Sequence, residues 1–236
     1  MLREEQRVII DGIAESWRIV WRGQPEPICD LEAGFTCACR PYAYGETGVA
    51  ELIRSRAGYP DQVLPLAQVF VGEGDVVRPS PNHAILRRWP VHDPDFKAED
   101  PAALAQQIRA RPVVRVMELQ DYNHDGWAAE FELAVDTTGC ADLRSVIVGV
   151  TRERNQLHAL SSVTNPTRAL LLQPKAWKAL LSVSGRPATT VEFECDFRGG
   201  DTQVEVELKA LQGRIFATRR EYACPKKGPP RSSTAF

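Results

Sequence analysis

Apolar and polar residues alternate along several short stretches of the chain, and this pattern predicts mostly β-strands. In residues 16–21 (SWRIVW), Trp17, Ile19 and Trp21 fall on one side of an extended chain. Further strands are predicted at 49–55, 113–119 and 130–135, and the continuous apolar runs at 145–150 and 169–172 predict buried strands. Towards the C-terminus, a clean alternation with short turns predicts an antiparallel meander of three strands at 189–197, 202–210 and 213–224.

Helical patterns are fewer. Residues 2–14 predict a short helix, the Asp100-Pro101 pair opens a second that runs to about Ala110, and Pro174 opens a third over residues 174–183. The sequence therefore predicts a mainly β, β-rich α+β fold with antiparallel sheets and two or three short helices. We expect a single domain over residues 1–224, whose N-terminal part is loop-rich at about 22–100. Residues 225–236 are expected to be a disordered tail.

The composition is that of an ordinary globular protein. Of 236 residues, 43% are hydrophobic and 25% are charged, which suffices for a sizeable core. A formal net charge of −2 gives no basic excess for nucleic acid. No apolar stretch reaches the roughly 18–20 residues that span a bilayer, so we predict neither a nucleic-acid partner nor a membrane span.

The six cysteines favour disulfides in an exported protein over free buried thiols. Zinc ligands usually stand two to four residues apart, whereas Cys37 and Cys39 are separated by one residue, and no Cys-x-x-Cys pair exists. The N-terminus carries no secretory signal, but such a segment is removed on export and its absence decides little. We expect a periplasmic or extracellular location, with the cytoplasm as the alternative.

Candidate chemistry is concentrated in residues 121–132 (DYNHDGWAAEFE). Asp121, Asn123 and Asp125 place oxygen-bearing side chains at alternate positions, and Gly126 then allows a sharp turn with positive φ. A chain that wraps one hard cation presents alternate side chains to it, and calcium prefers six to eight oxygens. We therefore predict a Ca²⁺ site. Its predicted ligands are these three side chains, the carbonyl of Trp127 and a downstream glutamate.

Two residues are candidates for the glutamate that completes the ligand set, Glu130 and Glu132. Glu132 stands where an EF-hand loop has its bidentate Glu, but an EF-hand needs helices on both sides, and here residues 113–119 and 130–135 alternate like strands. Such a loop between strands resembles the Asp-x-Asn-x-Asp-Gly calcium loops of integrin-type FG-GAP repeats. Those loops usually continue with Asp at the ninth position, where Ala129 stands. Glu130 or Glu132, both expected on the outward face of their strand, is the substitute.

Four patches of the chain are also similar to an uncharacterised bacterial family of exported proteins. They are SWRIVW, the cysteine segment ending in PYAYGETG, RVMELQDYNHDGWAAEFEL and ATRREYAC. This resemblance implies no known activity.

Other functions compete with the calcium hypothesis. Asp, Asn and Gly also form metal-free turns. A hydrolase would use the polar loop around His92, Asp93 and Asp95, although no nucleophile motif stands beside them. A carbohydrate- or peptide-binding groove would use aromatic residues, which at these spacings are more often core: Trp17, Trp21, Trp89, Trp127, Trp177, Tyr42 and Tyr44. The sequence favours an exported, calcium-binding structural or interaction module over an enzyme, and it does not disclose the protein or carbohydrate partner.

Overall fold

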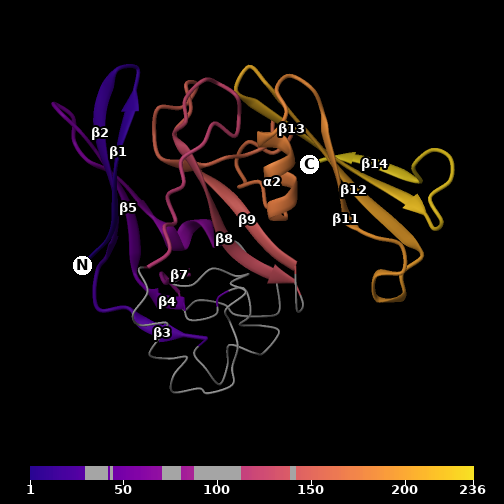
Figure 1. Ribbon diagram of the computed structural model, residues 1–236, viewed down its shortest axis with the longest axis horizontal. Coiled ribbons are helices and arrows are strands. Elements are labelled where there is room, and N and C mark those ends of the chain that lie inside the picture. The colour runs from indigo at the N-terminus through magenta and orange to yellow at the C-terminus, as the bar shows by residue number, and fades with distance from the viewer. Residues whose placement is uncertain (30–41, 43–44, 71–80, 88–112, 139–141) are drawn as a thin grey trace. The chain divides into compact units, whose positions relative to one another are not determined.

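The structure is a computed structural model of the whole chain, and it describes residues 1–29, 42, 45–70, 81–87, 113–138 and 142–236 (Figure 1). The fold is mainly β, as predicted, with four small antiparallel sheets. Helical structure in the described ranges includes α2 (Pro174–Leu181) and the 3-10 turns η2 (Leu66–Val69) and η3 (Phe197–Gly199). The predicted helix at 101–110 lies outside the described residues.

The chain divides into two compact units. Unit 1 comprises Met1–Glu118 and Glu132–Ser145, and unit 2 comprises Leu119–Phe131 and Val146–Phe236. Two strands cross from one unit to the other, β8 (Glu130–Thr138) and β9 (Asp142–Gly149). They confirm the strands predicted at 130–135 and 145–150, and they form a sheet of order β10-β9-β8 with β10 (His158–Ala159). That residues 1–224 form a single domain stays a prediction.

Unit 1 contains two sheets. The larger has the order β1-β2-β5-β6, with β1 (Leu2–Ile10), β2 (Ile13–Trp21), β5 (Ala50–Arg56) and β6 (Gln62–Pro65). The smaller has the order β3-β4-β7, with β3 (Glu26–Ile28), β4 (Gly45–Gly48) and β7 (Ala84–Leu86). The strands predicted at 16–21 and 49–55 are confirmed, and the part expected to be loop-rich contains further short strands.

The helix predicted at residues 2–14 is wrong. This segment forms β1 and the start of β2, joined by a turn in which Asp11 and Gly12 have φ values of 50° and 75°. Asp-Gly is a strong signal for a two-residue hairpin turn, because both central residues need positive φ. Burial along β1 follows a period of two, since Val8 and Ile10 are buried whereas Ile9 between them is 75% exposed.

The strand predicted at residues 113–119 is also absent. The backbone N–H groups of Val116 and Met117 donate to the Glu4 carboxylate, at 2.8 and 3.0 Å, and Arg3 donates to the carbonyl of Val114. Side chains of β1 therefore form hydrogen bonds with backbone N–H and carbonyl groups that pairing with a neighbouring strand would need.

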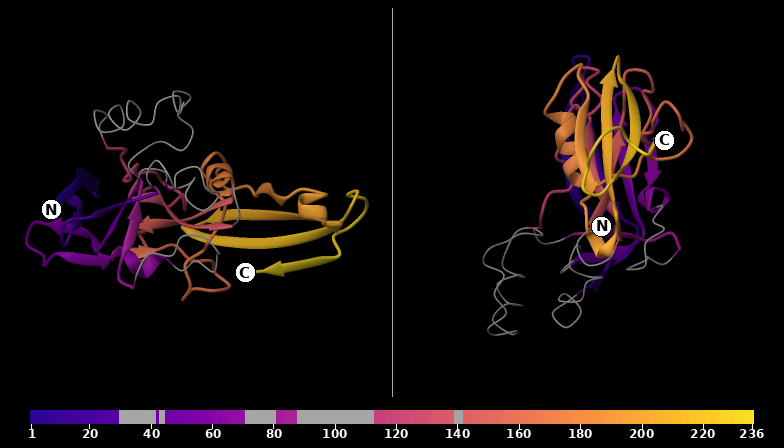
Figure 2. Two further views of the ribbon diagram at one scale, coloured as in Figure 1. Left: turned by 90° about the horizontal axis from the view of Figure 1, so that it is seen from below. Right: turned by 90° about the vertical axis from the view of Figure 1, so that its right-hand side faces the viewer.

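Unit 2 is built on the sheet β11-β12-β13-β14, formed by β11 (Ala188–Phe193), β12 (Thr202–Leu211), β13 (Arg214–Ala223) and β14 (Ser232–Ala235). The predicted three-strand meander and the helix at 174–183 are confirmed. Trp177 and Leu180 of α2 pack with Val206, Leu208 and Ile215 of the sheet in one buried cluster. Figure 2 shows β12 and β13 running side by side as the long strands of this sheet.

Two further predictions in unit 2 fail. Residues 225–236 were expected to be a disordered tail, but β14 pairs with β13 from Thr218↔Ala235 to Glu221↔Ser232. The run ALLL at 169–172 forms isolated bridges rather than a strand, with Ala169 paired to Ser161 and a second bridge at Leu172. Its leucines are apolar because Leu170 and Leu172 lie in the core around Trp177, and not because they form a strand.

Candidate metal centre

The acidic segment forms a closed loop at the start of β8. Gln120 and Glu130 are joined by two backbone hydrogen bonds, of 2.7 Å from the Gln120 N–H and 3.1 Å from the Glu130 N–H. The loop between Gln120 and Glu130 therefore begins and ends at this hydrogen-bonded pair. The loop lies entirely in unit 2, whereas Glu132 lies in unit 1.

Inside the loop, the alternate polar side chains accept hydrogen bonds from the main chain. Asp121 Oδ1 accepts from Asp125 N at 3.0 Å, and Asp121 Oδ2 accepts from Gly126 N at 2.9 Å. Asn123 Oδ1 also accepts from Asp125 N, at 3.1 Å, while Asp125 Oδ1 accepts from Trp127 N at 2.9 Å. Two residues have the positive φ of a sharp turn, 56° at His124 and 92° at Gly126, so the expected role of the glycine is confirmed.

Glu130 is the most unusual residue of the loop. Its side chain has no exposed surface, and its Oε2 accepts from the backbone N–H groups of Tyr122 and Asn123, at 2.8 and 3.3 Å. Its Oε1 is buried without a hydrogen-bond partner among the residues that the structure describes. The expectation that Glu130 faces outward is therefore wrong, because the loop folds over this face of the strand.

Burial raises the pKa of Glu130 to about 9, against the lowering effect of the Tyr122 and Asn123 amides. The carboxylates of Asp125 and Asp121 raise that pKa further by repulsion. Both aspartates therefore act in the same direction as burial on the Glu130 carboxyl.

Glu132 is engaged elsewhere. Its Oε1 accepts a hydrogen bond of 2.5 Å from the Ser145 hydroxyl, within unit 1. Burial raises the pKa of Glu132, although Ser145 and the guanidinium of Arg87 act to lower it.

The remaining loop residues anchor it in unit 2. The His124 ring Nε2 lies 2.9 Å from the carbonyl of Leu180 in α2, and the Tyr122 ring meets the Trp177 ring edge-on at 6.2 Å. Trp127 is only 8% exposed, and the guanidinium of Arg152 lies over its ring. This position of a calcium loop normally points to solvent, whereas the His124 ring lies against the carbonyl of Leu180.

The loop offers hard oxygen donors of several kinds, but it does not present a compact cluster of acids. Across the part of the chain that the structure describes, no three Asp, Glu, His or Cys side chains lie close enough to hold a metal ion. Glu130 Oε1 is buried and has no hydrogen-bond partner in the described part of the chain, and leaving such an atom unpaired is costly.

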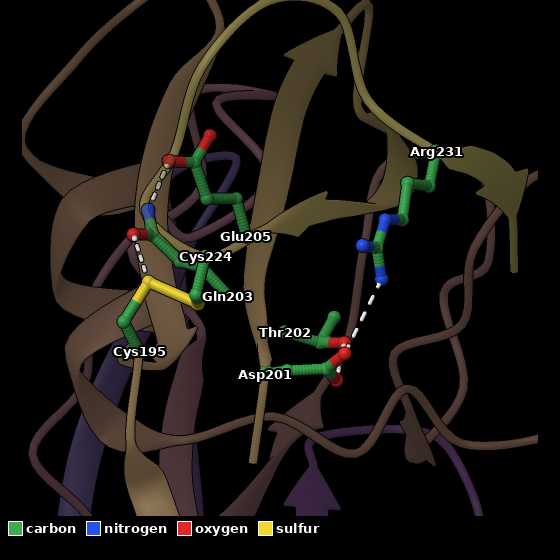
Figure 3. Close-up of a disulfide and its surroundings, with 7 residues drawn as sticks. All are labelled: Cys195, Asp201, Thr202, Gln203, Glu205, Cys224 and Arg231. Carbon is green, nitrogen blue, oxygen red and sulfur yellow. Dashed lines mark hydrogen bonds and ion pairs between the residues drawn. A yellow bond between two sulfur atoms is a disulfide. The ribbon is translucent and has the colours of Figure 1, made fainter.

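A disulfide joins Cys195, which follows β11, to Cys224, which follows β13 (Figure 3). Gln203 lies beside it, with its Oε1 3.8 Å from Cys195 Sγ and its Nε2 donating to Glu205 at 2.8 Å. Cys29 in unit 1 is also disulfide-bonded. These bonds confirm that cysteines of this chain serve as cross-links.

The hydrolase and groove hypotheses rest mainly on residues elsewhere in the chain. His92, Asp93, Asp95, Trp89 and Tyr44 lie outside the described residues. The other aromatic candidates are core residues, since Trp17, Trp21, Trp177 and Tyr42 are at most 1% exposed.

The chain matches no protein-family model, no curated protein and no solved structure. Within the described ranges, no helix is long and apolar enough to cross a membrane.

Proposed function

We propose that the loop binds one calcium ion. Its ligands are the side chains of Asp121, Asn123 and Asp125, the carbonyl of Trp127 and the carboxylate of Glu130. The observation that carries this proposal is the buried Glu130 carboxyl, whose Oε1 has no donor among the described residues and which is coupled to two aspartates. Burying such a group without a partner is costly, and a cation between the carboxylates removes that cost.

Glu130 closes the site rather than Glu132. The backbone amides of Tyr122 and Asn123 hold Glu130 inside the loop, whereas Glu132 is bonded to Ser145 in unit 1. Because the acids do not already form a compact cluster, an ion has to draw the loop closer around itself. Water completes the six to eight oxygens that calcium prefers.

We assign the ion a structural role in an exported interaction module. It neutralises acids that otherwise repel one another and fixes the turn that leads into β8. The Cys195–Cys224 disulfide supports a periplasmic or extracellular location, because such bonds persist in oxidising compartments. Extracellular calcium modules bind the ion with dissociation constants of about 10⁻⁴ to 10⁻³ M, and we expect this range.

A calcium titration followed by thermal unfolding tests the proposal. Binding to the folded state alone stabilises it by about 2.7 kcal/mol at a hundredfold excess over Kd, so the melting temperature rises with calcium. Asp121→Asn keeps the shape of the side chain, removes its charge and abolishes the rise. Asp201→Asn is the control, since Asp201 lies on the surface beside Arg231, 3.7 Å away, and leaves the rise intact.

A second readout covers the case in which Asp121→Asn does not fold. Trp127 lies in the loop, so terbium bound there emits when tryptophan is excited, and calcium competes the signal away. A wild-type chain whose melting temperature stays constant up to about 100 mM calcium, a hundredfold excess over the weakest expected Kd, and which does not sensitise terbium, contradicts the proposal.

A further inference from the structure

The turn between β12 and β13 lies directly against the acidic loop. Gln212 and Gly213 form this turn with φ values of 52° and 77°. A Cβ atom at Gly213 would lie 3.1 Å from Asp125 Cβ and 3.8 Å from Asn123 Nδ2. The glycine is therefore needed for its positive φ and also for its close approach to two proposed ligands.

Asp125 is fixed on its other side as well. Its Oδ2 accepts from the Arg152 backbone N–H at 2.8 Å and from Asn123 Nδ2 at 3.0 Å, and its Oδ1 accepts from Trp127 N. With Gly213 behind its Cβ, this side chain cannot move without moving the turn.

An ion pair ties the same two segments together. Arg214, the first residue of β13, donates to Glu153 through Nη2 at 2.9 Å and through Nε at 3.2 Å. Glu153 follows Arg152, whose N–H holds Asp125. The turn thus contacts the acidic loop directly through Gly213 and indirectly through the 152–153 segment.

We propose that the β12–β13 turn is a positioning element of the calcium site, in which Gly213 sets the place of Asp125, so that ion binding and the order of the β12–β13 hairpin are coupled. This inference rests on the proposed calcium binding. That a ligand is expected at all follows from a separate feature, the unexposed Glu130 side chain whose Oε1 lacks a partner in the described part of the chain. Because coupling is reciprocal, calcium stabilises the turn and the turn strengthens calcium binding.

Gly213→Ala tests the coupling, and Gly12→Ala is a matched control. Gly12 stands in the β1–β2 turn with φ 75°, after Asp11 with φ 50°, but a Cβ there meets no atom within 4 Å. Both substitutions strain the backbone of a two-residue turn, and only Gly213→Ala presses on Asp125. Calcium affinity, measured by calorimetry, falls by about 10- to 100-fold in Gly213→Ala, as for other residues that position metal ligands, and is unchanged in Gly12→Ala.

The outcomes separate the two proposals. Equal affinity in Gly213→Ala and Gly12→Ala, with calcium still bound, overturns the coupling alone. A wild-type chain that binds no calcium removes the proposed function and the coupling with it.

Hydrogen exchange of the wild-type chain covers the case in which Gly213→Ala does not fold. Calcium slows amide exchange at residues 211–215 more than in β11 of the same sheet. An equal effect in both places overturns the coupling.

Discussion

Glu130 accepts a hydrogen bond of 2.8 Å from the backbone N–H of Tyr122, at the point where the acidic loop enters β8. This bond keeps a carboxyl group in the interior of unit 2, where the charges of Asp125 and Asp121 raise its pKa. Most of the properties that we predict for the loop follow from that placement.

Without calcium, Glu130 makes the protein less stable as the pH rises. Its pKa is about 9 in the folded chain, above the ordinary value of 4.5, so between these pH values the folded state binds more protons than the unfolded state. The contribution of Glu130 to the free energy of unfolding is therefore fully present below pH 4.5. It declines towards pH 9, by up to about 1.4 kcal/mol per pH unit.

Denaturant unfolding in a chelator at pH 5 to 9 measures this dependence. Glu130→Gln removes most of the slope, whereas the same change at the exposed Glu194 keeps it. Parallel slopes in wild type and Glu130→Gln would show that the Glu130 carboxyl is not buried as described.

Close packing behind the loop predicts a severe effect of Gly149→Ala. A Cβ at Gly149 overlaps the carbonyl oxygen of Ala129 and comes within 2.7 Å of Glu130 Cα. Since backbone atoms cannot move aside, we expect the free energy of unfolding to fall by at least about 3 kcal/mol, the upper range of overpacking.

Gly23→Ala is the control for this prediction, because a Cβ there meets no atom within 4 Å. Its free energy of unfolding should change by no more than about 0.5 kcal/mol. Similar denaturation midpoints for the two variants would refute the close approach of β9 to the loop.

Unit 1 contains a buried ion pair whose loss we expect to be costly. Arg54 donates to Glu15 through Nε and Nη2, both at 2.6 Å, and both side chains are at most 3% exposed. Arg54→Met removes both hydrogen bonds of this pair and leaves the buried Glu15 carboxylate with the more distant Arg56, whose Nε lies 3.9 Å from Glu15 Oε1, so the free energy of unfolding falls by about 3 kcal/mol. Arg214→Met, in an exposed pair, leaves stability nearly unchanged in denaturant unfolding.

The same pair predicts acid sensitivity. Burial raises the pKa of Glu15, but hydrogen bonds from Arg54 and Trp17 outweigh burial and hold the pKa below its ordinary 4.5. This stabilisation is present above pH 4.5 and is lost as the pH falls through the folded pKa. Wild type should lose stability more steeply than Arg54→Met in this acid range, and equal slopes would contradict the account.

Local patterns in the sequence predicted much of unit 2. The meander, α2 and the strands that became β8 and β9 have strong periodicity and clear turn residues, which are local properties. Near the N-terminus, the weak helical pattern of residues 2–14 outweighed the Asp11-Gly12 pair, although that pair predicts a hairpin.

The failures near the loop have a non-local cause. Val116 and Met117 donate to Glu4, which lies more than a hundred residues earlier, and no local pattern reveals such bonds. Likewise, alternation places Glu130 opposite Phe131 and predicts that it is exposed, because it takes no account of a loop folding back over that face. The spacing of Asp121, Asn123 and Asp125 was visible in the sequence, but Gly213 as their neighbour was not.

Crystals grown in calcium test the central claim most directly, through anomalous diffraction at a long wavelength. The account predicts one anomalous peak in the loop, about 2.3–2.6 Å from oxygens of Asp121, Asn123, Asp125 and Glu130. A well-ordered loop without a peak at saturating calcium, with Glu130 still bonded only to the amides of Tyr122 and Asn123, would contradict it.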